Sequence, residues 1–287
     1  MPEGPEIRRA ADDLAHVLTG RRLIHVDYRI PRLARKARSL RAAKVTRVYT
    51  RGKALLIDFD NGLTHYSHNQ LYGEWEVTAG ARTQDDGRTV RVVLATASHT
   101  ATLYSATQVE LLDTGKVDRH PYVAKLGPEV LDSSTTAAMM RTRLADPRFA
   151  NRSLASLLLD QRFIAGLGNY LRSDILFAAG LPSGARPRDL DPAQRTRLAH
   201  EIRKIARQSY RTGGVTNDPA RVRASARSGV AYADYRFLAY GRAGSPCWTC
   251  GTTIERNDTG GRGLFHCPTC QPPLKRRSRA KTPIIAQ

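Results

Sequence analysis

The chain has 287 residues, a length that allows two domains with separate hydrophobic cores. It carries 46 Lys and Arg residues against 26 Asp and Glu residues, which gives a formal net charge of +20 at pH 7. A charge of this size indicates a polyanionic partner, above all nucleic acid, although a solubilising charge or an arginine-rich coding bias would also produce it. The N-terminus has no secretory signal and no segment has about 18 consecutive apolar residues, so we expect a cytoplasmic protein with no membrane partner.

The first residues, Met-Pro-Glu-Gly-Pro-Glu, carry a candidate nucleophile. Removal of Met1 would leave Pro2 as a secondary amine, and an ordinary α-amino pKa of about 8 keeps part of it neutral at physiological pH. Such an amine can attack an electrophilic sugar carbon, and the carboxyl group of Glu3 is one residue away to move protons for that attack. The alternative is a frayed N-terminal leader with no chemical role.

One helix followed by a β-sandwich or barrel is predicted for the N-terminal half. Residues 5–18 place apolar side chains on one helical face, and Gly20 follows as a stop signal. Between residues 22 and 112, short runs of alternating apolar and polar residues predict strands. These runs are residues 23–28, 44–49, 54–59, 89–94, 100–104 and 108–111.

The hydrophobic period becomes helical after Pro121 and predicts a second, helical domain. Its predicted helices are residues 134–144, 152–159, 170–178 and 192–211. Residues 213–229 are rich in Gly, Asn, Asp, Pro, Arg and Ser, and we interpret them as a loop or linker. The basic tail, residues 272–287, has no periodicity and is expected to be disordered, either as a solvated charge run or as an extra DNA-binding arm.

A glycine-rich motif, Gly-Leu-Gly-Asn-Tyr at residues 166–170, lies between two of the predicted helices. Its two glycines allow a sharp turn and a close approach to a ligand, and the amides that open the next helix favour a phosphate group. A turn that only joins two core helices has the same composition. The spacing by itself leaves both interpretations open.

All four cysteines lie in the pattern Cys247-x-x-Cys250, sixteen residues, Cys267-x-x-Cys270. Two such pairs can curl around one ion so that four thiolates complete a tetrahedron, which predicts a structural zinc site. Two redox dithiols or four unrelated thiols are the alternatives. Between the pairs, two strand-like runs flank a polar, glycine-rich segment and predict a β-hairpin with Arg262 at or near its tip.

Five separated motifs together carry a resemblance to a known family. They are residues 2–6, residues 51–53 (Arg-Gly-Lys), residues 67–73 (Ser-His-Asn-Gln-Leu-Tyr-Gly), residues 166–170 and the four cysteines. In order and approximate spacing the chain resembles the formamidopyrimidine DNA glycosylase/endonuclease VIII family over roughly residues 2–271. The resemblance implies a bifunctional DNA glycosylase/AP lyase of base excision repair. Such an enzyme acts as a monomer on damaged double-stranded DNA and carries one structural Zn2+ per chain.

The same resemblance implies an α+β multidomain fold. We expect an N-terminal catalytic β-sandwich domain with flanking helices over residues 1–121, and a helical domain with a helix-two-turn-helix element over residues 122–229. A zinc-finger β-hairpin would follow over residues 230–271, and then the basic tail. In a bacterial cell the expected location is the cytoplasm, in association with the nucleoid.

The catalytic roles that the resemblance implies fall on Pro2, Glu3, Lys53 and Arg262. The amine of Pro2 would attack the anomeric carbon of the damaged nucleotide, release the base and form a Schiff base. Glu3 matches the acid/base of the family, and Lys53 matches a lysine that contacts the sugar and phosphate near the lesion. The Schiff base acidifies the neighbouring sugar protons, which leads to β,δ-elimination.

The DNA-binding roles fall on four further residues, and Arg262 of the catalytic set also contacts the DNA backbone. Asn169 matches the phosphate-binding asparagine of the helix-two-turn-helix element, and Arg262 matches the zinc-finger arginine that grips phosphates around the flipped nucleotide. Gln70, Leu71 and Tyr72 match the loop that fills the gap left by the extruded base, which apolar and flat side chains can do. The alternative for these three is the end of a core strand.

Gly4 and the loop residues 70–72 favour oxidised pyrimidines such as thymine glycol and dihydrouracil, because the sister family of formamidopyrimidine/8-oxoguanine DNA glycosylases has a leucine after Pro-Glu and a different loop triad. That sister activity is the first alternative. A non-catalytic damaged-DNA-binding protein is the second, and its expected signature, loss of Pro2 or Glu3, is not present. Asp174 departs from the family, since a longer acidic residue is typical there.

Overall fold

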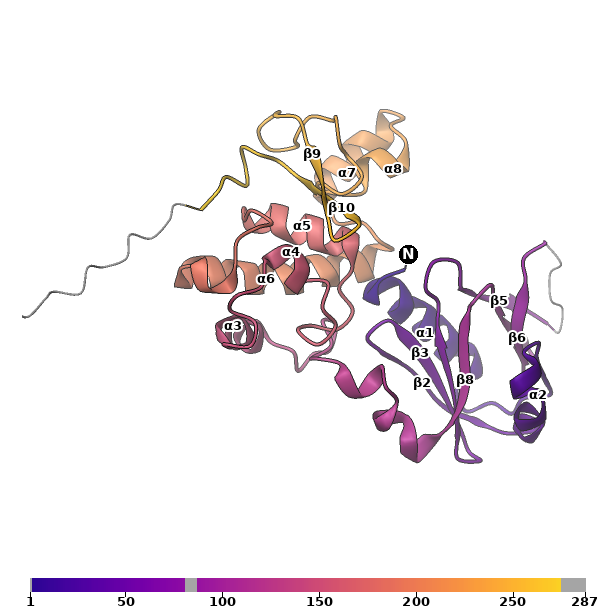
Figure 1. The fold of residues 1–287 in the computed structure, drawn as a ribbon. Helices are drawn as coiled ribbons and strands as arrows, with labels where there is room; N and C mark the ends of the chain where they lie inside the picture. Colours follow the sequence, from indigo (N-terminus) through magenta and orange to yellow (C-terminus); the bar gives the residue numbers. More distant parts are fainter. Residues whose placement is uncertain (1, 81–86, 275–287) are drawn as a thin grey trace, which may run out of the picture. The chain divides into compact units, whose positions relative to one another are not determined.

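The computed structural model describes residues 2–80 and 87–274 (Figure 1). The chain divides into two compact units. Unit 1 comprises Met1–Thr135, Asp160–Gly168 and Arg203–Thr216, and unit 2 comprises Thr136–Leu159, Asn169–Ile202 and Asn217–Gln287. Within the described ranges, no helix combines the length and the apolar character that a membrane crossing requires.

Unit 1 begins with helix α1, Gly4–Leu18, which confirms the predicted first helix. The backbone N–H of Glu3, the N-cap residue, donates to Oε2 of Glu6 at 2.9 Å, so one of the amides at the start of the helix is satisfied locally. The buried face repeats at helical spacing through Ile7, Ala11, Leu14 and Leu18. Burial of this face fixes the rotation of α1 and therefore the direction in which the N-terminal residues leave it.

Two four-stranded antiparallel sheets form the rest of the N-terminal architecture. The first has the order β1-β6-β7-β5, with β1 His25–Tyr28, β5 Glu74–Ala79, β6 Val90–Ala95 and β7 His99–Tyr104. The second has the order β2-β3-β4-β8, with β2 Val45–Arg51, β3 Ala54–Phe59, β4 Leu63–His68 and β8 Gln108–Asp113. All six predicted strands are confirmed. Strands β4 and β5 and helix α2, Pro31–Ala37, were not predicted.

Helix α1 packs against strands of both sheets, β2 and β3 on one and β5 and β7 on the other (Figure 1). The main core therefore combines its apolar face with the inward side chains of the strands, among them Leu55 and Ile57. The alternate residues of β3, Ala54 and Leu56, point to a smaller cluster with Tyr66. Because β3 is buried on both faces, its position is fixed more strongly than that of an edge strand.

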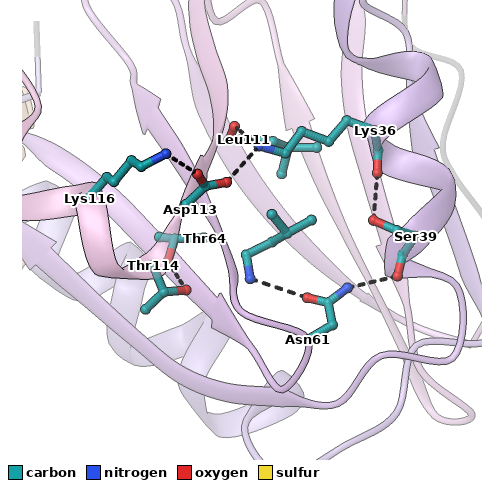
Figure 2. Close-up of polar contacts among 9 residues, drawn as sticks. Lys36, Ser39, Asn61, Thr64, Leu111, Asp113, Thr114 and Lys116 are labelled. Carbon is teal, nitrogen blue, oxygen red and sulfur yellow. Dashed lines mark hydrogen bonds and ion pairs between the residues drawn. The ribbon is translucent and has the colours of Figure 1, made fainter.

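Polar contacts tie helix α2 to the end of the second sheet, as Figure 2 shows. Nζ of Lys36 donates to Oδ1 of Asp113 at 3.2 Å, and Nζ of Lys116 donates to Oδ2 of the same carboxylate at 2.7 Å. The side-chain amide of Asn61 donates to the Ser39 carbonyl at 2.7 Å. Lys116 and then Lys36 lower the pKa of Asp113. These groups are exposed, so they order the loops and contribute little to stability.

Unit 2 contains the C-terminal helices and a two-stranded hairpin. Its elements are α3 Ala137–Ala145, α4 Leu154–Leu157, α5 Asn169–Ala179, the first part of α6 Pro192–Thr212, α7 Pro219–Arg227, α8 Tyr232–Tyr235, β9 Glu255–Thr259 and β10 Arg262–His266. The four predicted helices and the predicted hairpin are confirmed. The remaining turns of α6 belong to unit 1.

Residues 213–229 were predicted as a loop, and this prediction was wrong for α7. The carboxylate of Asp218 accepts from the amides of Ala220 and Arg221 at 3.0 Å each, and Pro219 occupies the first helical turn. An aspartate N-cap followed by proline is a helix-start signal, and here it outweighs the turn-forming composition around it.

Candidate functional site

Pro2 lies at the wall of a cavity of about 850 Å3 in unit 1. Glu6 of α1 lines the same cavity, and so do Asn69, Leu71 and Tyr72 from the loop between β4 and β5. The structure thus brings the predicted nucleophile to the same cavity as two of the three predicted gap-filling residues. Met1, whose removal would free the amine of Pro2, lies outside the described residues.

Glu3 is buried, with 3% of its surface exposed, and its carboxyl group lies directly against Gly168. A Cβ atom at position 168 would overlap Cδ of Glu3. One residue on, the Gly4 amide donates to the Gly166 carbonyl at 2.8 Å, and a Cβ at Gly4 would lie 2.9 Å from Cα of Gly166. The glycine-rich motif that the sequence left open therefore forms the surface on which the N-terminus rests.

Gln161 holds this glycine loop in place. Its Oε1 accepts from the Gly166 amide at 2.9 Å, and its Nε2 donates to the Leu167 carbonyl at 2.8 Å. One side chain thus satisfies two consecutive peptide groups of the loop. Because the loop cannot shift without breaking both bonds, the position of Glu3 is determined by the backbone rather than by a mobile surface segment.

Lys53 lies in the two-residue turn between β2 and β3 and is 7% exposed. Two side chains accept the amides of this turn: Oε1 of Glu129 accepts from Gly52 at 2.6 Å, and Oη of Tyr122 accepts from Lys53 at 2.9 Å. Burial, and then the charge of Lys53, lower the pKa of His68 to about 4. Ala54, the next residue in the chain, pairs with His68, the last residue of β4, which directly precedes the loop at the Pro2 cavity.

Glu129 was not singled out from the sequence. Burial raises the pKa of its carboxyl group to about 7, while the Gly52 amide and the charge of Arg51 oppose that change. It lines a second cavity of unit 1, about 300 Å3 in volume, together with Gly4 and Gly166. A buried acid beside the N-terminal residues is recognisable only in three dimensions, since nothing adjacent in the sequence marks it.

The loop after β4 presents two apolar side chains to solvent. Leu71 is 56% exposed and Tyr72 is 76% exposed. The loop is tight: the Gly73 amide donates to the Asn69 carbonyl at 2.8 Å, and Gln70 has a left-handed φ of 49°. A non-glycine residue in that conformation is strained, and strain of this kind gathers at binding loops. The structure places Gln70, Leu71 and Tyr72 beyond the strand end and outside the core.

In unit 2, Asn169 is the first residue of α5 and contacts the predicted hairpin. Its Nδ2 donates to the Gly263 carbonyl at 2.9 Å, and its Oδ1 accepts from Nη2 of Arg172 at 2.5 Å. Arg172 is fully buried and also donates to the carbonyls of Arg262 and Gly263 at 3.5 and 3.4 Å. The structure thus brings Asn169 and the backbone of Arg262 together, and the Arg262 residue itself is exposed.

Helix α5 carries two buried charged residues, Arg172 and Asp174, for which the sequence predicted no role. The carboxylate of Asp174, fully buried, accepts three backbone amides: Leu238 at 3.1 Å, Ala239 at 2.8 Å and Tyr240 at 2.9 Å. Three such bonds stabilise the ionised form of a buried carboxylate. Asp174 therefore fixes the segment that leads into the first cysteine pair.

The four cysteine sulfurs lie within 4.8 Å of one another. The Sγ atoms of Cys250 and Cys267 are 3.5 Å apart, and those of Cys247 and Cys270 are 3.8 Å apart. In a tetrahedral site with metal–sulfur bonds of about 2.3 Å, the sulfurs would be about 3.8 Å apart. Each close contact joins a cysteine of one pair to a cysteine of the other, so the four residues are placed to bind one metal ion rather than to act as two separate dithiols.

Two family models match the chain. The formamidopyrimidine-DNA glycosylase N-terminal domain matches residues 1–111, and the formamidopyrimidine-DNA glycosylase H2TH domain matches residues 126–219. The chain belongs to the formamidopyrimidine-DNA glycosylase family. Its members are DNA glycosylases with AP lyase activity, which confirms the enzyme class predicted from the sequence.

Relatives of the family are similar along almost the whole chain. Endonuclease 8 of Escherichia coli K12 is 45% identical over 271 residues, which are 94% of this chain and 100% of that protein. Endonuclease 8 of Shigella sonnei is 44% identical with the same coverage. Both relatives are bacterial, and the resemblance to the formamidopyrimidine DNA glycosylase/endonuclease VIII family is confirmed.

Solved structures show the same fold at lower identity. The Lactococcus lactis Fpg in complex with DNA that contains an oxidised pyrimidine has a TM-score of 0.77 and 21% identity, and covers 95% of this chain and 100% of that chain. The same enzyme with DNA that contains N7-benzyl-Fapy-dG has a TM-score of 0.78 and 22% identity, with the same coverage. The predicted α+β fold class is confirmed.

Proposed function

We propose that the protein excises oxidised pyrimidines, such as thymine glycol and dihydrouracil, from damaged double-stranded DNA and then cleaves the strand. The observation that carries this proposal is the position of Pro2 at the wall of a large cavity, one residue before the buried Glu3. An amine that opens into a cavity, with an acid fixed beside it, is the arrangement that imine chemistry on a sugar needs. The choice of pyrimidines rests on Gly4 and on residues 70–72, which differ from the pattern of the sister family for oxidised purines.

In the proposed mechanism the amine of Pro2, freed by removal of Met1, attacks C1′ of the damaged nucleotide. The new N–C1′ bond forms as the bond between C1′ and the base breaks, and Glu3 moves the protons that the sugar and the leaving base require. The sugar ring opens to a Schiff base. Loss of a C2′ proton then expels the 3′ phosphate, and a second elimination expels the 5′ phosphate, so the strand is cut on both sides of the lost base.

Lys53 is proposed to contact the sugar and phosphate at the lesion, because it directly precedes Ala54, which pairs with His68 at the start of the loop that lines the Pro2 cavity. We propose that Leu71 and Tyr72, with Gln70, occupy the gap that the extruded nucleotide leaves in the duplex. The exposure of Leu71 and Tyr72 supports this role, since an exposed aromatic side chain can stack where a base was removed.

We further propose that Asn169 and Arg262 bind phosphates around the flipped nucleotide and that the four cysteines hold one structural Zn2+. The sulfurs of Cys247, Cys250, Cys267 and Cys270 fit a zinc tetrahedron, which has no open position for catalysis. The metal would fold the hairpin that carries Arg262. DNA as substrate implies a place in the cytoplasm of a bacterial cell, in association with the nucleoid, and the enzyme is proposed to act as a monomer.

The proposed functional domains are a catalytic N-terminal domain over residues 1–121, a helix-two-turn-helix domain over residues 122–229 and a zinc finger over residues 230–271. The basic tail, residues 272–287, falls outside the described residues beyond position 274. We assign the tail no function.

Borohydride trapping tests the proposal directly. The processed protein is incubated with a duplex that contains one thymine glycol, beside a second duplex that contains 8-oxoguanine, and we expect a covalent adduct mainly with the first. A Pro2→Leu variant is the control, because a bulky second residue prevents removal of Met1 and turns the nitrogen at position 2 into an amide that cannot attack. An adduct only with 8-oxoguanine would assign the chain to the sister activity, and tight binding without any adduct would favour a non-catalytic damaged-DNA-binding protein.

A further inference from the structure

We infer that Tyr122 is a positioning residue for catalysis: its hydroxyl group fixes Lys53 by accepting the backbone N–H of that residue. This inference rests on the proposed contact between Lys53 and the sugar-phosphate at the lesion. Tyr122 and Lys53 are 69 residues apart in the chain, and the distance from the Lys53 nitrogen to Oη of Tyr122 is 2.9 Å.

The contact is close and specific. A Cβ atom at Gly52 would lie 2.6 Å from Oη of Tyr122, so the turn approaches the hydroxyl as closely as a glycine allows. Gly52 has a left-handed φ of 61°, which a glycine adopts without strain. The hydrogen bond therefore depends both on the conformation of the turn and on the position of the tyrosine ring. If either one shifted, the hydroxyl would no longer be within hydrogen-bond distance of the turn amide.

Strand pairing alone does not hold the turn. Arg51 pairs with Ala54, so Gly52 and Lys53 form the two-residue connection, and both of their amides are bound by side chains from outside the hairpin. Glu129 takes the first amide and Tyr122 takes the second. Because both amides are bound, the conformation of the turn is fixed. The direction in which the Lys53 side chain leaves the backbone is therefore fixed as well.

The aromatic ring of Tyr122 connects this turn to strand β4. It meets the ring of His68 edge to face at 5.4 Å and the ring of Tyr66 at 6.5 Å. The charge of Lys53 also lowers the pKa of His68. His68 directly precedes Asn69, which lines the Pro2 cavity. Tyr122 thus sets the position of Lys53 relative to the strand that leads into the candidate site.

A purely structural role is the competing explanation, since a buried amide that loses its acceptor also costs stability. Tyr66 provides a matched control because it belongs to the same aromatic cluster as Tyr122. Its Oη is buried and has no hydrogen-bond partner among the residues that the structure describes. Tyr→Phe at either position leaves the ring in place and removes one hydroxyl, but only at Tyr122 does that hydroxyl bind the Lys53 turn.

The experiment compares Tyr122→Phe with Tyr66→Phe in single-turnover cleavage of a duplex that contains a preformed abasic site. A displacement of about 1 Å at a catalytic group can slow a reaction up to about a hundredfold, so we expect Tyr122→Phe to be roughly tenfold slower at saturating enzyme. DNA affinity should stay within about twofold for both variants, and Tyr66→Phe should cleave at the wild-type rate. Equal rates for the two variants would overturn the inference.

A double-mutant cycle with Lys53→Ala identifies the route of the effect. If Tyr122 acts through Lys53, Tyr122→Phe causes no further loss in the Lys53→Ala background. Independent, additive losses would overturn the positioning role even if Tyr122→Phe alone is slow. Absence of any adduct or cleavage by the wild-type enzyme would instead overturn the proposed function itself, so the two failures are distinguishable.

Discussion

The carboxyl group of Glu3 lies directly against the Cα of Gly168, so closely that a methyl group on that carbon would overlap Cδ of the acid. The two residues are far apart in the chain, and the contact brings the first turn of α1 onto the loop that Gln161 braces. A buried acid needs a fixed environment to act at one atom of a substrate. Because Gly168 has no side chain, the carboxyl group of Glu3 can occupy the space beside its Cα.

Gly168→Ala should therefore displace Glu3 and slow base release by at least about tenfold, since a displacement of about 1 Å at a catalytic group can cost up to about a hundredfold. Overpacking of this kind also destabilises the fold by about 1–3 kcal/mol. Gly184→Ala is the control, because a Cβ there meets nothing within 4 Å. Rates of thymine glycol excision and urea unfolding curves check both effects. A Gly168→Ala enzyme with wild-type base release would show that the contact does not hold Glu3 in its working position.

Glu3→Gln should separate the two activities of the enzyme. The amide occupies nearly the same space against Gly168 but cannot move a proton, so release of a damaged base should fall by about a hundredfold or more, within the usual range for a general acid/base. Cleavage at a preformed abasic site should persist in part, because there is no base to release. Gel assays on the two duplexes measure this difference. Equal losses on both substrates would contradict the assignment of Glu3 to the base-release step.

Elements with a clear hydrophobic period were predictable from the sequence. Helix α1 and strand β3 were placed within one residue of their observed ends, because each buries a regular face. Strand β4 was missed since its sequence, Leu-Thr-His-Tyr-Ser-His, has no apolar alternation, and its buried residues include the polar Thr64, His65 and Ser67. In α7 the composition predicted a loop, while the capping pair Asp218 and Pro219 started a helix.

The candidate site was predictable only where a motif carries its own chemistry, as the N-terminal proline and the paired cysteines do. Tyr122, Glu129 and Arg172 could not be found in this way. Their partners are 69, 77 and up to 91 residues distant in the chain, and no local spacing encodes such contacts. The charged pair Arg172 and Asp174 within a largely apolar helix was the available signal, since buried charges must find hydrogen-bond partners.

Arg262→Ala should weaken DNA binding and make it less sensitive to salt. If its exposed guanidinium neutralises one phosphate, the slope of log K against log salt should decrease by about 1, since each neutralised phosphate releases roughly 0.9 counterions. Arg41→Ala, also at an exposed arginine, is the charge-matched control and should change the slope less. Fluorescence anisotropy between low and moderate salt gives both slopes. Identical slopes for the two variants would mean that Arg262 contributes only to the general charge.

Cys247→Ser should remove the metal and unfold the hairpin of β9 and β10, because the folding of so small a module is linked to metal binding. We expect one zinc per wild-type chain by elemental analysis, and at least about a tenfold loss of DNA affinity in the variant, the usual scale for two or three lost charge-assisted contacts. Circular dichroism should show that the two sheets of unit 1 persist. Wild-type affinity in a protein shown to be free of metal would separate the cysteine cluster from DNA binding.

Glu129 should make the stability of the protein depend on pH near neutrality. Burial raises the pKa of its carboxyl group from the ordinary 4.5 to about 7, so the folded state binds this proton more tightly than the unfolded state does. The stabilising contribution is therefore complete below about pH 4.5 and is lost as the pH rises through 7. At about 1.36 kcal/mol per pKa unit, the upper limit of the loss is roughly 3 kcal/mol.

Glu129→Gln tests this dependence, because the amide oxygen can still accept the Gly52 N–H that Oε1 now accepts at 2.6 Å, while the titrating group is gone. Urea unfolding at pH 5 and pH 8 should show the wild type losing stability relative to the variant as the pH rises. Asp258→Asn is the control, since that side chain is 68% exposed and pairs with Arg256 of the hairpin, not with Arg51. Parallel pH profiles for wild type and Glu129→Gln would mean that the carboxyl group is ionised in the folded protein well below pH 7, and that the Gly52 amide and Arg51 outweigh its burial.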